Sequence, residues 1–183
     1  MPRAYIAGTA ATRPQMIHVC SLARVPEVAN QIGASHVITL LRDVDLIVRP
    51  PRVAPDNHLI IHVDDITCPI DGYTHPCEEH IGELIDFVQA WDRAAPLLVH
   101  CYAGISRSTA AAFTAACALQ PQRDETEIAQ ALRRASPTAT PNALIVSLAD
   151  RVLGRRGRMI EAVQMIGRGA EAYEGRPFCL QMD

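Results

Sequence analysis

One segment, Pro96–Leu119, constrains the fold of this chain more than any other. It begins with the apolar run PLLV, Pro96–Val99, which is typical of a buried strand. It ends with RSTAAAFTAACAL, Arg107–Leu119, a run of apolar and small residues that predicts a helix buried on most sides. Only the short stretch HCYAGIS separates the two, so a strand turns directly into a packed helix, as α/β folds require.

The rest of the chain continues the alternation of strands and helices. Runs rich in β-branched residues predict strands at Ser35–Leu41 and His58–Val63, and shorter candidates lie at 4–7 and 16–20. Three prolines predict a loop over 48–57. The other expected helices are 26–33, Pro76 to Trp91, 124–135, Thr140 to near Gly154 and 159–166. We therefore expect only helices after the turn at HCYAGIS.

This order predicts an α/β fold, with helices on both sides of a central, mostly parallel sheet. The length suits one domain over 1–183, with a core of about 35–153. The net charge of −3 gives no reason to expect a nucleic-acid or membrane partner. The longest apolar run is too short to span a bilayer, and the start lacks a secretory signal. Because the six cysteines lack paired spacing, we expect a cytoplasmic protein with reduced thiols.

The turn itself has the chemistry of an anion site. A helix N-terminus offers unpaired N–H groups and a positive dipole end, and a tight loop adds further N–H groups. Gly104 permits backbone angles that other residues resist, and Arg107 offers a planar fork of donors. The residues expected to hold a phosphate are Tyr102, Ala103, Gly104, Ile105, Ser106 and Arg107. Cys101 lies beneath this cradle, and thiols in such settings ionise readily.

The stretch HCYAGISRS resembles the HC-x5-R-[S/T] signature of the cysteine-dependent protein tyrosine phosphatases, most closely the compact, bacterial-type dual-specificity branch. The likeness extends more loosely over about 35–152. It implies that Cys101 attacks phosphorus and that Arg107 holds the equatorial oxygens, without a cofactor or metal. It also implies that His100 fixes the loop and that Ser108 hydrogen-bonds the sulfur. The plainer interpretations are that His100 is a histidine buried in the core and that Ser108 caps the helix.

Phosphate ester hydrolysis also needs an acid to protonate the leaving group. IIHVDDIT resembles the strand-then-aspartate element of the family, and Asp65 falls on its acid, 36 residues before Cys101. Asp64 is the near rival because a one-residue slip is easy at a strand end, and Asp71 lies in the following loop. A protonated Asp65 beside an ionised Cys101 predicts a bell-shaped activity profile on the acid side.

The stretch SPTATPN, ending at Asn142, resembles the Pro-Asn element of dual-specificity phosphatases, whose asparagine braces the phosphate loop. The plainer interpretation is a helix start at Thr140-Pro141. Three further features are expected to be structural. The first is a group of possible zinc ligands whose spacing matches no common zinc site: Cys68, His75, Cys77 and His80. The second is a run of arginines expected on a solvated face rather than on phospholipid or an acidic partner: residues 151, 155, 156, 158 and 168. The third is Cys117, which is expected in the core.

Substrate choice is the least constrained inference. The loop positions between Cys101 and Arg107 carry no lysine or arginine, which argues against a highly phosphorylated headgroup and favours phosphotyrosine in a protein or peptide. Tyr73 and Tyr102 are the candidate aromatic walls. Phosphoserine or phosphothreonine and small-molecule phosphates stay open. A rhodanese-like sulfurtransferase and a non-catalytic phosphopeptide-binding module rank lower, and the mid-chain cysteine disfavours the low-molecular-weight tyrosine phosphatases.

Overall fold

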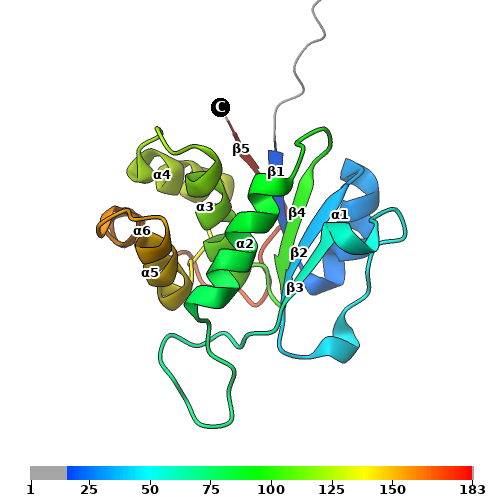
Figure 1. The fold of residues 1–183 in the computed structure, drawn as a ribbon, viewed down its shortest axis with the longest axis horizontal. Helices are drawn as coiled ribbons and strands as arrows, with labels where there is room; N and C mark the ends of the chain where they lie inside the picture. Colours follow the sequence, from blue (N-terminus) through cyan, green and yellow to red (C-terminus); the bar gives the residue numbers. More distant parts are fainter. Residues whose placement is uncertain (1–15, 183) are drawn as a thin grey trace, which may run out of the picture.

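Five strands form one sheet in the order β3-β2-β4-β1-β5 (Figure 1). The computed structural model describes residues 16–182, so the strand predicted at 4–7 lies outside the described residues. The strands are β1 (Met16–Ser21), β2 (His36–Leu40), β3 (His58–Ile61), β4 (Leu97–Cys101) and β5 (Phe178–Gln181). The first four run parallel and β5 pairs antiparallel with β1, which confirms a central, mostly parallel sheet.

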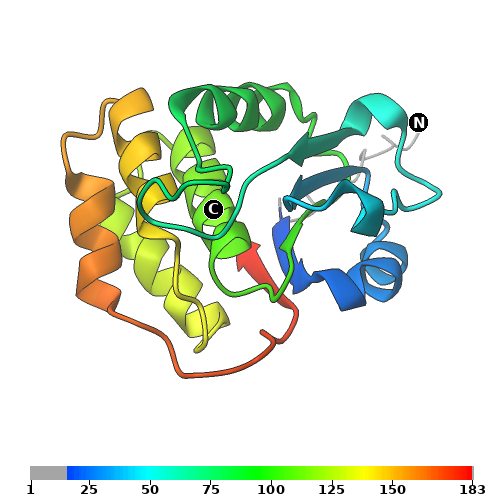
Figure 2. The same ribbon diagram turned by 90° about the horizontal axis from the view of Figure 1, so that it is seen from below.

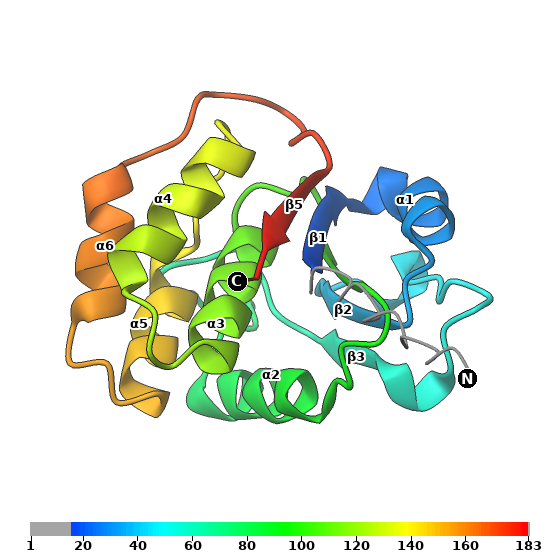
Figure 3. The ribbon, with the colours of Figure 1, turned by 90° about the horizontal axis from the view of Figure 1, so that it is seen from above.

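Helices cover both faces of this sheet (Figures 1 and 3). The helices are α1 (Val25–Ile32), α2 (Glu78–Ala90), α3 (Arg107–Leu119), α4 (Glu125–Ala135), α5 (Ala143–Val152) and α6 (Arg158–Ile166). Helix α1 packs on one face against Val37 and Leu98, while α2 and α3 pack on the other. Every residue of α3 except Ala118 is buried, because α4, α5 and α2 enclose its outer side.

The strand β5 corrects the expectation that the chain is all helical after the turn. It is only four residues long, Phe178–Gln181, which is too short for a periodic signal in the sequence. Its backbone hydrogen bonds come from β1, with Ile17 opposite Leu180. A strand whose partner lies at the other end of the chain is set by tertiary pairing rather than by its own residues.

Two helices begin slightly later than the sequence suggests. Helix α2 begins at Glu78 rather than at Pro76, with Cys77 and His80 closing a reciprocal cap at its N-terminus. Helix α5 begins at Ala143, and Asn142 caps it by accepting the Ile145 N–H at 3.1 Å. In both cases the proline precedes the cap, where its fixed φ leads the chain into the helix.

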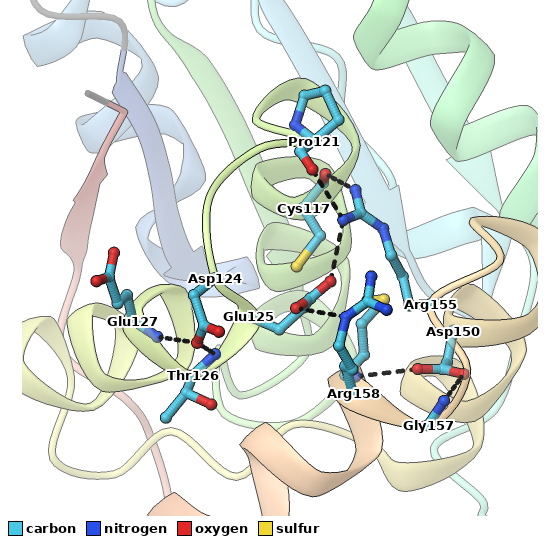
Figure 4. Close-up of polar contacts among 11 residues, drawn as sticks. Cys117, Pro121, Asp124, Glu125, Thr126, Glu127, Asp150, Arg155, Gly157 and Arg158 are labelled. Atoms are coloured by element: carbon cyan, nitrogen blue, oxygen red, sulfur yellow. Dashed lines mark hydrogen bonds and ion pairs between the residues drawn. The ribbon is translucent and has the colours of Figure 1, made fainter.

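A buried ion cluster ties α4 to the α5–α6 connection (Figure 4). The Arg155 guanidinium donates to the Glu125 carboxylate at 3.0 Å and to the carbonyls of Cys117 and Pro121. Arg158 donates to the second oxygen of Glu125 at 3.1 Å. The expectation of one solvated arginine face is therefore wrong for Arg155, which is buried and internally paired. Cys117 lies in the core as expected, where burial raises the pKa of its thiol to about 12.

No helix in residues 16–182 has the length and apolar character needed to cross a membrane. The same range holds no cluster of three or more histidine, cysteine, aspartate or glutamate side chains arranged to bind a metal ion. Of the zinc-like group, Cys77 and His80 contact each other as the cap of α2, and Cys68 is exposed.

Candidate active site

The candidate site lies at the carboxyl end of β4, where the chain turns into α3. Residues 101–107, here called the phosphate loop, lie between two other segments (Figure 2). One is the connection 62–77 between β3 and α2, here called the Asp65 loop. The other is the segment 167–177 between α6 and β5, here called the C-terminal strap. The carboxyl ends of parallel strands are the usual place for such a site in an open α/β sheet.

The Cys101 sulfur lies at the bottom of the phosphate loop. The residue is 2% exposed, and its Sγ accepts the Gly104 N–H at 3.3 Å. The Ser108 hydroxyl, in the first turn of α3, lies 3.1 Å from the same sulfur. Ser108 therefore contacts the sulfur, and no side-chain cap is formed at the start of α3. Donors of this kind stabilise negative charge on sulfur.

Gly104 is required by the shape of the loop. Its φ is +72°, in the left-handed region that side chains resist. A Cβ at this position would lie 2.8 Å from the backbone carbon of Cys20 and from the backbone nitrogen of Ser21. The phosphate loop therefore rests directly on the end of β1, and only glycine allows that approach.

Arg107 is buried without using all its donors. It is 8% exposed, and its Nη1 donates to the Val63 carbonyl at 2.8 Å, which fixes the side chain against the start of the Asp65 loop. Its Nε is buried and has no hydrogen-bond partner within residues 16–182. A buried guanidinium N–H without a partner is costly. This arrangement suits a bound anion, because the fork of donors matches two oxygens of a phosphate.

The two adjacent aspartates face different ways. Asp65 accepts from the Ser106 hydroxyl at 2.6 Å and from the Asn142 side-chain amide at 2.9 Å, both at its Oδ1. Asp64 instead accepts the Thr74 N–H at 2.8 Å and lies 3.6 Å from the Arg42 guanidinium. Asp65 thus contacts the phosphate loop, whereas Asp64 closes the Asp65 loop on itself.

Asn142 joins the same assembly in an unexpected way. The resemblance predicts that it braces the phosphate loop, and its backbone N–H does donate to the Ser106 carbonyl at 3.2 Å. Its side chain, however, donates to Asp65 and to the Ile66 carbonyl. Asn142 therefore connects the phosphate loop to the Asp65 loop. The third candidate, Asp71, is exposed at the far part of that loop.

His100 is buried beside the site and takes part in a chain of hydrogen bonds. Its Nε2 lies 2.6 Å from the Thr39 hydroxyl, which also lies 2.8 Å from the Nε2 of His58. Burial lowers the pKa of His100 to about 4, although the contact with the Cys101 carbonyl opposes this. His100 is therefore neutral at pH 7 and is fixed by two neighbours. No local pattern pointed to Thr39, because its contact with His100 depends on the pairing of β2 with β4.

A cleft of about 520 Å³ adjoins the phosphate loop on the side of Ser106. Its walls come from the loop, from Thr140 and from the strap, and its main side chains are Ile105, Ser106, Thr140, Arg168, Glu171 and Tyr173. Tyr173 is fully exposed and also borders a second hollow of about 350 Å³ next to Tyr102. Tyr73 lies half-exposed on the Asp65 loop, with the Arg42 guanidinium 5.6 Å from its ring centre. Sequence reasoning did not find Tyr173.

Comparison with known proteins agrees with this geometry. Residues 68–138 match the protein-tyrosine phosphatase family, a range that includes the whole phosphate loop but neither Asp65 nor Asn142. No curated protein sequence matches the chain. Among solved structures, DUSP15 has 17% identity and a TM-score of 0.61, over 89% of this chain and 97% of its own.

Two further solved structures are similar in extent. A mouse putative dual specificity phosphatase complexed with zinc tungstate has 19% identity and a TM-score of 0.60, with 87% of this chain and 98% of its own covered. Human DUSP28 has 21% identity and a TM-score of 0.59, with coverage of 79% and 94%. At these identities the structural likeness establishes the fold alone, which is that of the dual-specificity phosphatases.

Proposed function

We propose that this chain, which has the dual-specificity phosphatase fold, is a member of the cysteine-dependent protein tyrosine phosphatase superfamily and hydrolyses phosphate monoesters through a cysteinyl-phosphate intermediate. One observation carries the proposal. The unpaired, buried Nε of Arg107 lies at the same loop whose Gly104 N–H binds the Cys101 sulfur. A thiolate and an anion cradle in one loop are the two parts that this reaction needs.

In the first step the Cys101 thiolate attacks phosphorus, and a sulfur–phosphorus bond forms as the ester bond to the leaving oxygen breaks. Arg107 and the loop amides stabilise the charge on the equatorial oxygens. Asp65 donates a proton to the departing oxygen. Because the Oδ1 of Asp65 accepts from Ser106 and Asn142, Oδ2 is the oxygen that we assign to this proton transfer.

In the second step water attacks the phosphorus of the cysteinyl phosphate. Asp65, now a carboxylate, accepts a proton from that water, and the bond to sulfur breaks to release inorganic phosphate and the Cys101 thiolate. Ser108 is within hydrogen-bond distance of the sulfur and stabilises it as the leaving group. The neutral His100 and Thr39 hold the backbone at Cys101 during both steps.

Protein or peptide phosphotyrosine is the substrate we propose. The leaving group must pass Asp65, and the cleft beside Ser106 adjoins this position. Tyr102 and Tyr173 are exposed beside the phosphate loop and Tyr73 is exposed on the Asp65 loop, so these side chains offer aromatic surface to a phenyl ring. The cleft carries one arginine and one glutamate, which suits a substrate with a single phosphate rather than a highly phosphorylated headgroup.

The proposal is tested with a chromogenic aryl phosphate and three variants. Cys101→Ser should abolish turnover, because a hydroxyl is a much weaker nucleophile than a thiolate. Asp65→Asn should lower kcat by about 10²-fold or more, the usual contribution of a positioned acid. Asp64→Asn is the matched control and should change kcat far less, since Asp64 binds Thr74 rather than the phosphate loop.

Other outcomes identify the alternatives. Full activity in Cys101→Ser would refute the mechanism, because that variant lacks the proposed nucleophile. Transfer of sulfur from thiosulfate to cyanide would favour a sulfurtransferase, and phosphopeptide binding without turnover would favour a binding module. A panel of phosphotyrosine, phosphoserine and phosphothreonine peptides together with nucleotide and sugar phosphates then decides the substrate class. A higher kcat/KM on small-molecule phosphates would overturn the choice of phosphotyrosine.

A further inference from the structure

The phosphate loop is held in place from outside by four backbone hydrogen bonds, which come from three segments distant in sequence. If the N–H groups of such a loop converge on an anion, its carbonyls must point outward and be satisfied elsewhere. Four of these carbonyls accept backbone N–H groups at 2.8–3.2 Å. The pairs, donor first, are Leu22 with Tyr102, Gly175 with Ala103, Thr140 with Ile105, and Asn142 with Ser106.

The shortest of these four bonds comes from the C-terminal strap. The Gly175 N–H donates to the Ala103 carbonyl at 2.8 Å. Gly175 is buried, and a Cβ on it would lie 2.8 Å from the Gly104 carbonyl oxygen and 3.4 Å from the Ile105 side chain. Since the nearest atom is backbone rather than a flexible side chain, only glycine permits this contact. The strap therefore presses directly on the part of the loop whose N–H binds the Cys101 sulfur.

The strap is anchored on both sides of Gly175. On one side the Ser21 hydroxyl donates to the Glu174 carboxylate, which ties the strap to the end of β1, and β5 follows directly. On the other side the Ala170 N–H donates to the Pro137 carbonyl, and Arg133 donates to the Gly167 carbonyl. The segment is thus held at several points, and Gly175 transmits that position to the phosphate loop.

We propose that the C-terminal strap is part of the catalytic apparatus and that Gly175 is a positioning residue, which sets the orientation of the Ala103–Gly104 peptide toward the Cys101 sulfur and the bound phosphate. The inference rests on the proposed phosphatase activity. It assigns a role in the reaction to a segment beyond the core of about 35–153 that the sequence suggested. Gly175 acts only through the loop and touches neither the sulfur nor the phosphate.

The test compares Gly175→Ala with Gly82→Ala in the full chain. Both add one methyl group, but a Cβ at Gly82 meets no atom within 4 Å. Gly175→Ala should lower kcat for an aryl phosphate by about 10²-fold, with a smaller change in KM, as displacements of about 1 Å at a reacting centre do. Gly82→Ala should keep kcat within about twofold. Thermal unfolding scans confirm that each variant is folded at the assay temperature.

Inorganic phosphate supplies a second measurement that does not need turnover. Phosphate should raise the melting temperature of the wild-type chain and raise that of Gly175→Ala much less. A folded Gly175→Ala that keeps wild-type kcat and the full phosphate shift would overturn the inference. If Gly175→Ala does not fold, Glu174→Ala decides. This substitution removes one exposed anchor of the strap, and we expect a several-fold loss of kcat. An unchanged kcat would contradict a catalytic role of the strap.

The two proposals fail separately. A wild-type chain that turns over no phosphate ester refutes the proposed function, and the phosphate shift alone then decides the role of Gly175. If the wild-type chain is active and Gly175→Ala keeps its kcat and its phosphate-induced shift in melting temperature, the proposed function is supported and the catalytic role of the strap is refuted.

Discussion

Two buried arginines, Arg107 and Arg155, show how the same side chain serves different ends in this molecule. Arg155 is 7% exposed and binds Glu125 and two carbonyls, so its donors are used inside the protein (Figure 4). Arg107 is 8% exposed, yet only its bond to the Val63 carbonyl is formed and its Nε has no partner within residues 16–182. Burial alone therefore does not separate them.

The difference lies in what each neighbourhood leaves unsatisfied. Around Arg155 a carboxylate balances the charge, and the cluster is complete as folded. Arg107 forms no ion pair within residues 16–182, because Asp65 on the adjoining loop accepts from Ser106 and Asn142 instead, and the Nε of Arg107 has no hydrogen-bond partner there. A folded protein tolerates such an incomplete cluster where a ligand completes it. We therefore expect Arg155 to affect stability and Arg107 to affect activity.

The largest expected effect concerns activity. Arg107→Ala should lower kcat/KM for an aryl phosphate by about 10³-fold or more, the range known for arginines that stabilise a transferring phosphoryl group. Arg155→Ala should retain kcat at a temperature where the variant is folded, because it does not touch the phosphate loop. Steady-state kinetics on both variants measure this contrast. Equal losses of kcat/KM would contradict the assignment of Arg107 to activity and of Arg155 to stability.

The second effect is on stability, and here the substitution of Arg155 should have a larger effect than that of Arg107. Arg155→Ala leaves Glu125 with only the half-exposed Arg158 as its partner and should lower the free energy of unfolding by about 3 kcal/mol, as the loss of one member of a buried ion pair does. Arg107→Ala removes a single hydrogen bond to protein and should cost less. Urea unfolding monitored by circular dichroism compares them. A greater loss in Arg107→Ala would show that the loop is held by that arginine.

The third effect is a difference in pH dependence between the two regions. The pKa of His100 is about 4 in the folded chain, below the ordinary value of 6.5, so the unfolded chain binds more protons between these values. Its contribution to stability is complete above pH 6.5 and is lost as the pH falls toward 4, by about 3 kcal/mol over the window. His100→Gln should flatten the unfolding free energy over this range, and an unchanged slope would contradict it.

The arginine cluster should respond only at lower pH. Burial by itself raises the pKa of Glu125, but the hydrogen bond from Arg158 and the charges of Arg158 and Arg155 outweigh it and lower the pKa below 4.5. A lowered carboxyl pKa contributes stability that is present above 4.5 and is lost as the pH falls further. Glu125→Gln, followed by the same measurement, should therefore change the slope only below about pH 4.5, at the acid end of the His100 window.

Much of this site could be predicted because its parts are contiguous. Cys101, Gly104, Arg107 and Ser108 lie on one turn and one helical start, so local geometry alone brings them together. The strands β2, β3 and β4 and the burial of α3 also followed from runs of apolar residues, whereas the order of the strands in the sheet did not. The choice between Asp64 and Asp65 was open in the sequence, because a shift of one residue at a strand end reverses where a side chain points.

Other parts were not accessible to sequence reasoning, because each depends on residues far apart in the chain. Thr39 meets His100 across β2 and β4, and the Asn142 side chain meets Asp65 across 77 positions. The strand β5 and the strap carry no periodic pattern, and their positions follow from β1 and from the phosphate loop. The arginines after α5 resemble a surface run until Arg155 is seen to enter the interior.

The strand, the tight turn and the helix around Cys101 follow from local sequence, since short-range sterics and helix-end hydrogen bonding act within ten residues. Three other features are set by long-range packing: the carboxylate that contacts the loop, the arginine whose Nε lacks a partner within residues 16–182, and the distant amides that bind the loop carbonyls. Those choices depend on long-range packing, where one hydrogen bond or one missing Cβ selects between arrangements that look alike in sequence.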